Sequence, residues 1–169
     1  MSCTQHLQPN CIAVTETWLT AQSSLDHVQI DGYVFHNRPG GLCYSSFDPK
    51  LLELQGLEHG GVGLYSVGQL ECNVLQAPDL NLECLVCLFP KFSLVMALIY
   101  RPPCYSKSLF LPNLGMLLDY LNAISDTIVV MGDFNEDLVK KSSISKFMGE
   151  KGFRQHVTQE TTEKGTCLC

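Results

Sequence analysis

The chain has 169 residues, 46% of them hydrophobic and 17% charged, and 11 Lys and Arg against 17 Asp and Glu leave a net charge of −6. This composition predicts one compact domain and excludes a disordered, collagen-like or coiled-coil chain. No run approaches the roughly 20 apolar residues of a membrane span, and no apolar leader follows Met1. We therefore expect an intracellular protein, nuclear or cytoplasmic, that is not secreted and has no membrane partner; its oligomeric state is not predicted.

Short apolar runs bounded by Gly, Pro, Asn or Asp predict the strands of a largely buried sheet system. In chain order, these runs are residues 11–14, 62–67, 70–75, 82–89, 94–100 and 127–131. The runs at 94–100 and 128–131 are apolar on both faces, which is typical of central strands, whereas the run at 70–75 alternates. The pattern therefore predicts both central and edge strands.

Two helices are expected between and after the last strands. Residues 108–124 repeat leucines at three- and four-residue spacing, with Pro112 in the first turn, and residues 142–150 repeat apolar side chains in the same way. Residues 38–59 have no period and are rich in Gly and Pro, so we expect a loop insertion on the surface. The order strand, helix, strand indicates an α/β fold in a single domain.

Nine cysteines are present, and we expect reduced thiols that pack as small hydrophobic side chains. Cys84 and Cys87 form a CxxC pair, but strand alternation directs their thiols to opposite faces. Cys167 and Cys169 could share a face, although no second pair completes a four-ligand zinc set. The histidines show no ligand spacing either: His6, His27, His36, His59 and His156.

Polar side chains follow two of the predicted strands. Asp133 and Asn135 lie two apart and project from the same side, where the carboxylate could take a proton from water and the amide could hold that water or a phosphate oxygen. The same pattern is also typical of an ordinary turn. The Glu16 carboxylate could bind Mg²⁺. Alternatively, Glu16 could lie at the capped N-terminus of a helix. Trp18, beside it, is expected in the core.

A phenol and a guanidinium end the most apolar strand. Pro102 holds Arg101 in an extended conformation, so Tyr100 and Arg101 could bind phosphate together, or form a strand cap with a solvated Arg. The glycines at 60–63 lead into a strand rather than a helix, so they do not form a phosphate loop.

The net negative charge of the chain affects how it could bind nucleic acid. Proteins that neutralise nucleic-acid phosphates normally show a basic face, and the cations here are thinly spread apart from Lys140 and Lys141. DNA binding is therefore expected to be weak and salt-sensitive. The same balance suits a divalent cation held on carboxylates.

Four motifs, taken in order, resemble one known family. They are Thr-Glu-Thr-Trp-Leu at 15–19, Gly-Gly-Val-Gly-Leu-Tyr at 60–65, Ile-Tyr-Arg-Pro-Pro at 99–103 and Gly-Asp-Phe-Asn at 132–135. This order is similar to the endonuclease/exonuclease/phosphatase family, and specifically to the apurinic-type endonuclease domain of non-LTR (LINE-type) retrotransposons. The resemblance covers nearly the whole chain.

The resemblance implies a four-layer α/β sandwich of the DNase I-like type and hydrolysis of a DNA phosphodiester by metal-assisted attack of water. It implies that Glu16 holds Mg²⁺, or Mn²⁺ in its place. Asp133 would activate the water, Asn135 would position the water and the phosphate, and Tyr100 would bind a phosphate oxygen. Arg101 would add a contact to the substrate phosphate.

The chain departs from the family's pattern at both ends. No strand with the family's metal-side Asn precedes Glu16, Cys169 stands where the family has an Asp, and the closing Ser-Asp-His motif is absent. Losing one transition-state donor typically costs ~10² to 10³ in rate. We therefore expect a partial domain over residues 1–169, truncated at both ends, with a partial active site.

Three functions follow from the sequence as alternatives. The first is a Mg²⁺-dependent endonuclease of retrotransposon origin. The second is a catalytically inactive remnant of a retroelement, or an interaction module. The third is a small-molecule phosphatase on the same fold, because the family also cleaves phosphomonoesters.

Overall fold

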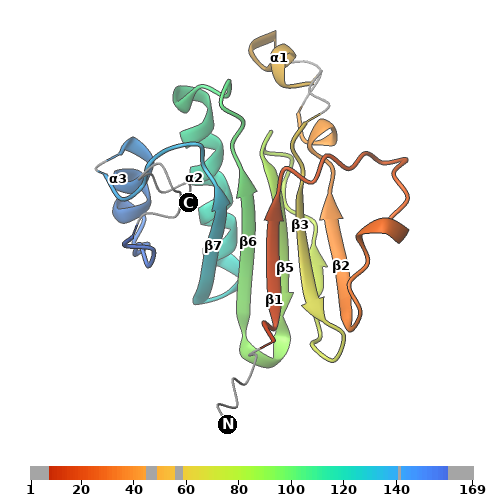
Figure 1. The fold of residues 1–169 in the computed structure, drawn as a ribbon. Coiled ribbons are helices and arrows are strands. Elements are labelled where there is room, and N and C mark those ends of the chain that lie inside the picture. Colours follow the sequence, from red (N-terminus) through yellow and green to blue (C-terminus); the bar gives the residue numbers. More distant parts are fainter. Residues whose placement is uncertain (1–7, 45–48, 56–58, 141, 160–169) are drawn as a thin grey trace.

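The computed structural model describes residues 8–44, 49–55, 59–140 and 142–159, which form two β-sheets with helices on one side (Figure 1). The expected α/β class is confirmed. Cys167, Cys169 and the family-like segment at 161–169 lie outside the described residues.

The first sheet has the strand order β1-β3-β2 and is antiparallel throughout. Its strands are β1 (Cys11–Thr15), β2 (Tyr33–Arg38) and β3 (Val62–Val67). The bounds predicted for β3 are confirmed. Strand β2 was not among the expected strands, although its aromatic and β-branched residues favour a strand.

The second sheet has the strand order β4-β5-β6-β7. Its strands are β4 (Asn73–Leu75), β5 (Glu83–Phe89), β6 (Leu94–Tyr100) and β7 (Thr127–Asp133). Only β6 and β7 pair in parallel, and the crossover between them is helix α2 (Lys107–Ile124), as the strand, helix, strand order predicted. The predicted bounds of β6 are confirmed, and β7 runs two residues beyond the prediction, to Asp133.

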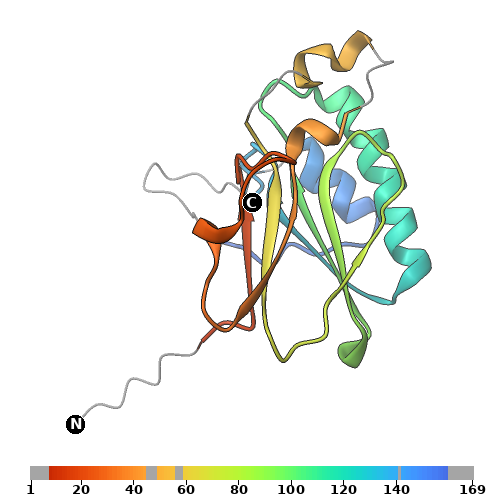
Figure 2. The same cartoon turned by 90° about the vertical axis from the view of Figure 1, so that its right-hand side faces the viewer.

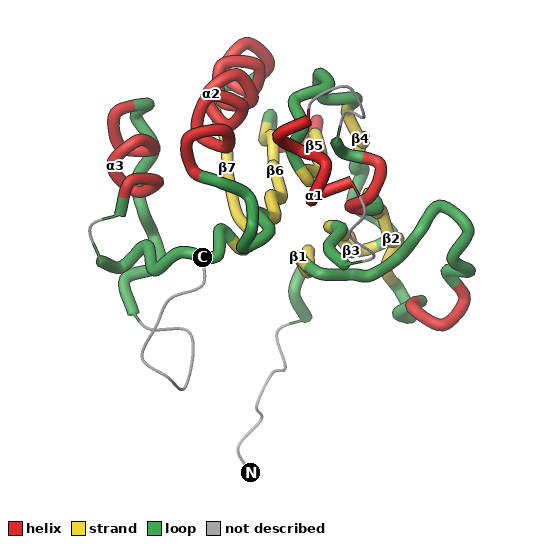
Figure 3. Tube along the Cα trace, turned by 90° about the horizontal axis from the view of Figure 1, so that it is seen from above, coloured by secondary structure: helices red, strands yellow, loops and turns green. Residues whose placement is uncertain are grey.

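Two apolar clusters hold together the layers, which Figure 2 shows from the side. One lies between the sheets and includes Leu64 of β3, Leu85 of β5 and Leu98 of β6. The other lies between the second sheet and its helices, α2 and α3 (Ser143–Glu150), which Figure 3 shows on one side of β6 and β7. Cys84 belongs to the helix-side cluster and Cys87 to the inter-sheet cluster, so their predicted opposite orientation is confirmed.

The six described cysteines carry free thiols: Cys11, Cys43, Cys72, Cys84, Cys87 and Cys104. Burial raises the pKa of the Cys84 thiol to about 12, more than the nearby Arg38 charge lowers it. This thiol therefore stays protonated and packs as an apolar group, as predicted for the cysteines in general.

The described residues of the segment 38–59 are not purely a surface excursion. They form two short 3₁₀ turns, η2 (Gly40–Leu42) and η3 (Pro49–Leu51), and the one-turn helix α1 (Leu52–Gln55). Cys43, Tyr44, Leu51 and Leu54 are buried in the helix-side cluster. Tertiary packing thus orders a stretch whose sequence has no period of its own.

No described helix has both the length and the apolar character needed to cross a membrane.

Candidate active site

Three of the predicted site residues meet at one end of the two sheets, where β1, β6 and β7 all terminate (Figure 1, top). The Tyr100 hydroxyl, at the end of β6, donates a hydrogen bond of 2.7 Å to Glu16 Oε1, which follows β1 in the other sheet. Tyr100 is also the register partner of Asp133 in the β6–β7 pair, so both side chains lie on the inter-sheet face. We call Glu16, Tyr100, Asp133 and Asn135 the strand-tip site.

The hydroxyl of Tyr100 is held in its protonated form. Burial, the hydrogen bond to Glu16 and the negative charges of Glu16, Glu83 and Asp133 all raise its pKa above the ordinary value for tyrosine. Because each of these effects disfavours a phenolate, Tyr100 acts as a hydrogen-bond donor at neutral pH.

Asp133 and Asn135 form a turn as well as a site, so the two interpretations of this motif are compatible. The Asn135 backbone N–H donates to Asp133 Oδ1 at 2.8 Å, and its side-chain Nδ2 donates to the Arg101 carbonyl at 2.9 Å. Phe134, between them, is buried in the helix-side cluster. The turn therefore fixes the carboxylate and the amide at the tip of β7.

Arg101, predicted to contact the substrate phosphate, is buried and bonded to backbone carbonyls. Its side chain is 5% exposed and donates to three carbonyl oxygens: to Phe134 from Nε at 2.6 Å, to Tyr105 from Nη1 at 2.5 Å and to Asn135 from Nη2 at 2.9 Å. These bonds tie the end of β6 to the turn after β7. The guanidinium thus stabilises the turn that carries Asp133 and Asn135.

The backbone is strained at three points of this region. Glu16, Trp18 and Asn135 have φ angles of 53°, 54° and 47°, a left-handed conformation that costs a non-glycine residue roughly 1–2 kcal/mol. Two bonds to the start of β3 hold the first two: Thr17 N to the Gly61 carbonyl at 3.3 Å and Trp18 N to the Gly60 carbonyl at 2.9 Å. The glycine-led motif therefore supports the Glu16 segment.

Trp18 is exposed rather than buried in the core, so that expectation is wrong. Its side chain is 60% exposed, and its ring lies 4.8 Å from that of His59, centroid to centroid. Left-handed turns at Glu16 and Trp18 redirect the backbone beyond the end of β1, at Thr15. Next to His59 is a hollow of about 240 Å³ whose lining includes Leu19, Leu42 and Gly60. Trp18 thus presents an accessible aromatic ring close to Glu16 in the chain.

The carboxylates of the strand-tip site suit a hard cation that needs few protein ligands. Among the described residues, no group of three or more His, Cys, Asp or Glu could hold a metal ion. Such a cage is unnecessary for Mg²⁺, which takes one or two protein carboxylates and keeps water and substrate phosphate as its other ligands. The exposed Glu16 carboxylate, with Asp133 nearby, fits this mode and does not fit a structural zinc site.

One acidic residue of this region, Glu83, was not predicted from the sequence. It pairs with Tyr100 in the β5–β6 register, so Glu83, Tyr100 and Asp133 form one row across three strands. Its side chain is 1% exposed. The signal was present in the sequence, because Glu83 is the only charged residue in the apolar run 82–89, and charged side chains are seldom fully buried without partners.

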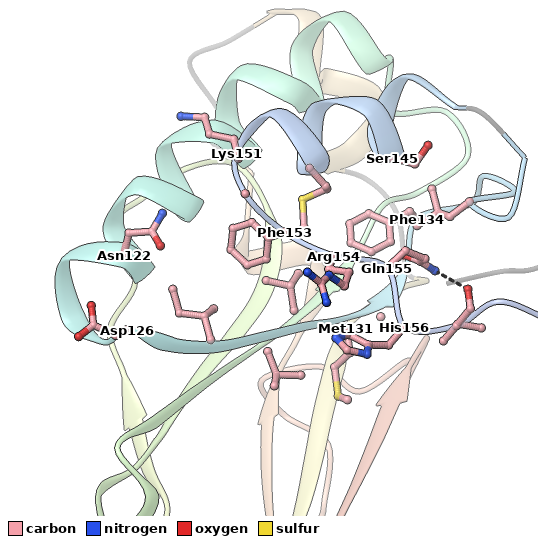
Figure 4. Close-up of a pocket in the computed structure, with 18 residues that line it drawn as sticks. Asn122, Asp126, Met131, Phe134, Ser145, Lys151, Phe153, Arg154, Gln155 and His156 are labelled. Carbon is pink, nitrogen blue, oxygen red and sulfur yellow. Dashed lines mark hydrogen bonds between the residues drawn. The ribbon is translucent and has the colours of Figure 1, made fainter.

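A larger hollow, of about 740 Å³, lies on the helix side of β7, and Gly132 and Phe134, on either side of Asp133 in the chain, line it (Figure 4). It is bounded by β7, α3 and the segment around Phe153, Arg154 and His156. Glu16, Tyr100, Asp133 and Asn135 are not among its lining residues. The candidate chemistry therefore lies at the tips of the strands and not among the side chains that line this hollow.

Comparisons with known proteins find a similarity to a solved structure and no family. No protein-family model matches the chain, and no curated protein matches it. Among solved structures, it is similar to the human Nocturnin catalytic domain, a structure with a bound sulfate anion, at 12% sequence identity and a TM-score of 0.47. The match covers 94% of this chain and 67% of that chain. The strand-tip site accordingly stands on the contacts of this chain's own residues.

Proposed function

We propose that the chain is a Mg²⁺-dependent phosphodiester hydrolase that cleaves DNA, as the endonuclease domains of LINE-type retrotransposons do. The observation that carries this proposal is the hydrogen bond from Tyr100 to Glu16, which joins the two sheets beside Asp133. It supports the proposal because metal-assisted phosphodiester hydrolysis needs a carboxylate to bind the metal, a neutral donor and a second carboxylate, and Glu16, Tyr100 and Asp133 would supply them.

Each residue has a distinct task in this proposal. Glu16 would hold Mg²⁺, which when bound supplies positive charge to the phosphate oxygens. Asp133, oriented by the Asn135 backbone N–H, accepts the proton of the attacking water. Tyr100 has one hydroxyl proton to donate, so a phosphate oxygen competes with Glu16 for it as negative charge develops on the phosphate.

Replacing Tyr100 by Phe tests the donor. We expect Tyr100→Phe to lower the rate of Mg²⁺-dependent plasmid nicking by ~10², the usual effect of removing one transition-state donor. Tyr120→Phe is the matched control, because the Tyr120 hydroxyl bonds the Gln76 carbonyl at an exposed site. Equal nicking rates in the two variants would contradict the role given to Tyr100.

Trp18 distinguishes DNA from a small phosphate as the substrate. An exposed aromatic ring beside the site can stack on a nucleobase, a contact worth about 1–3 kcal/mol per base. We expect Trp18→Ala to raise the KM for DNA by about tenfold and to leave the hydrolysis of a small phosphate ester unchanged. An equal effect on both substrates, or a preference of the wild type for inositol phosphates, would instead support the phosphatase alternative.

A further inference from the structure

The buried Glu83 carboxylate joins two segments that come from different parts of the chain. Its Oε1 accepts a hydrogen bond of 2.9 Å from the Tyr44 hydroxyl, and its Oε2 accepts one of 2.6 Å from the Gly61 backbone N–H. Tyr44 follows the turn η2, and Gly61 leads into β3. The Glu83 side chain, on β5, therefore holds both the segment after η2 and the segment before β3.

The glycines around this carboxylate allow its close approach. A Cβ atom built on Gly60 or on Gly40 would lie 2.5 Å from Glu83 Oε2, closer than any real Cβ contact. The backbone of these segments is therefore packed directly against the carboxylate. Any side chain at position 60 would displace Glu83 or the loop.

Gly60 and Gly61 also contact the segment that carries Glu16. The Gly60 and Gly61 carbonyl oxygens accept the hydrogen bonds from Trp18 N and Thr17 N. These bonds restrain the strained turn in which Glu16 has a φ of 53°. A continuous path of bonds thus runs from Glu83 through Gly61 to the residue next to Glu16.

We propose that Glu83 is a positioning residue, which holds the Gly60–Gly61 segment so that the Thr17–Trp18 backbone presents Glu16 to the metal and to Tyr100. The catalytic part of this inference rests on the proposed function, whereas the structural part does not. Glu83 does not reach the substrate, because it is 1% exposed and each of its oxygens already accepts a hydrogen bond.

A carboxylate suits this position better than an amide. Two donors approach Glu83, one at each oxygen, and a carboxylate has an acceptor at both, whereas Gln has one oxygen and one NH₂ group. Burial raises the pKa of Glu83, and the hydrogen bonds from Gly61 and Tyr44 oppose that rise. Glu83→Gln keeps the volume but removes the negative charge and one of the two acceptor oxygens, so it tests the hydrogen bonds and not the packing.

The experiment compares Glu83→Gln with Glu71→Gln, which removes the same charge from an exposed residue beside β4. Backbone amide hydrogen exchange is measured without metal, and Mn²⁺ is then titrated while the fluorescence of Trp18, the single tryptophan, is recorded. In Glu83→Gln we expect about tenfold faster exchange at Thr17, Trp18 and Gly61, with the centres of β5 and β6 unchanged. Loss of an outer-shell partner of this kind should also weaken Mn²⁺ binding by about 10- to 100-fold.

The outcomes separate this inference from the proposed function. A folded Glu83→Gln protein with wild-type exchange at Thr17 and Trp18 would overturn the inference, whatever the metal does. Faster exchange there, in a protein whose wild type binds no Mn²⁺, would support the positioning role and contradict the proposed function.

If Glu83→Gln does not fold, Tyr44→Phe replaces it. This variant removes one of the two donors and leaves the Gly61 bond in place. We expect amide exchange at Thr17, Trp18 and Gly61 to be about threefold faster than in the wild type, and Mn²⁺ binding to be about threefold weaker. Unchanged exchange at Thr17 and Trp18 in Tyr44→Phe would overturn the inference.

Discussion

Asp133→Asn is expected to lower Mg²⁺-dependent nicking of supercoiled plasmid by about 10² to 10⁴, the range that a general base contributes. The substitution keeps an oxygen that can accept from the Asn135 backbone N–H, so the turn after β7 is retained. It removes only the ability to take a proton from water. The measurement is the single-turnover nicking rate at saturating DNA and Mg²⁺.

The control for this variant is Asp126→Asn. Asp126 is exposed and precedes β7 at its other end, so the substitution makes the same chemical change far from the strand-tip site. We expect a wild-type nicking rate. Nicking that both substitutions leave unaltered would indicate a contaminating nuclease, and a cooperatively folded wild type that never nicks would support the inactive-remnant alternative.

Gly132→Ala is expected to cause the largest loss of stability of the variants considered. Gly132 has a φ of 141°, and a Cβ atom there would overlap the backbone carbonyl of Ile99 on the neighbouring strand β6. Backbone atoms cannot rotate away, so the parallel β6–β7 pairing must separate beside Tyr100 and Asp133. We expect a loss of about 3 kcal/mol or more in the free energy of unfolding, or roughly 6–12 °C in Tm.

Gly149→Ala provides the contrast by thermal melting. Gly149 lies within α3, and a Cβ atom there would have no heavy atom within 4 Å. Because alanine is the better helix former, this variant should gain about 0.5–1 kcal/mol. If Gly132→Ala melted at the temperature of Gly149→Ala, the close approach of β6 and β7 at Gly132 would be wrong.

The pattern of apolar residues along the sequence predicted most of the strands. The mainly apolar runs that form β3 and β6 have the predicted bounds, since each is enclosed by polar residues or turns. The helix α2 followed from its leucine spacing. Strand-end position also brought Glu16, Tyr100 and Asp133 to one edge, because strands of the same direction end together.

The remainder depends on contacts that a sequence pattern does not encode. Trp18 was expected in the core, and only the left-handed turns held by Gly60 and Gly61 explain its exposure. Arg101 was expected at a phosphate, whereas its partners are carbonyl oxygens as far away in the chain as Phe134 and Asn135. In both cases the deciding partner is more than 30 residues distant, beyond any periodic signal.

Manganese localisation in crystals tests the strand-tip site most directly. We predict an anomalous difference peak within bonding distance of the Glu16 carboxylate, on the side of Tyr100 and Asp133, in crystals soaked with Mn²⁺. The peak should disappear in Glu16→Gln crystals soaked in the same way. A well-ordered Mn²⁺ bound only to acidic residues elsewhere, with no density beside Glu16, would contradict the account.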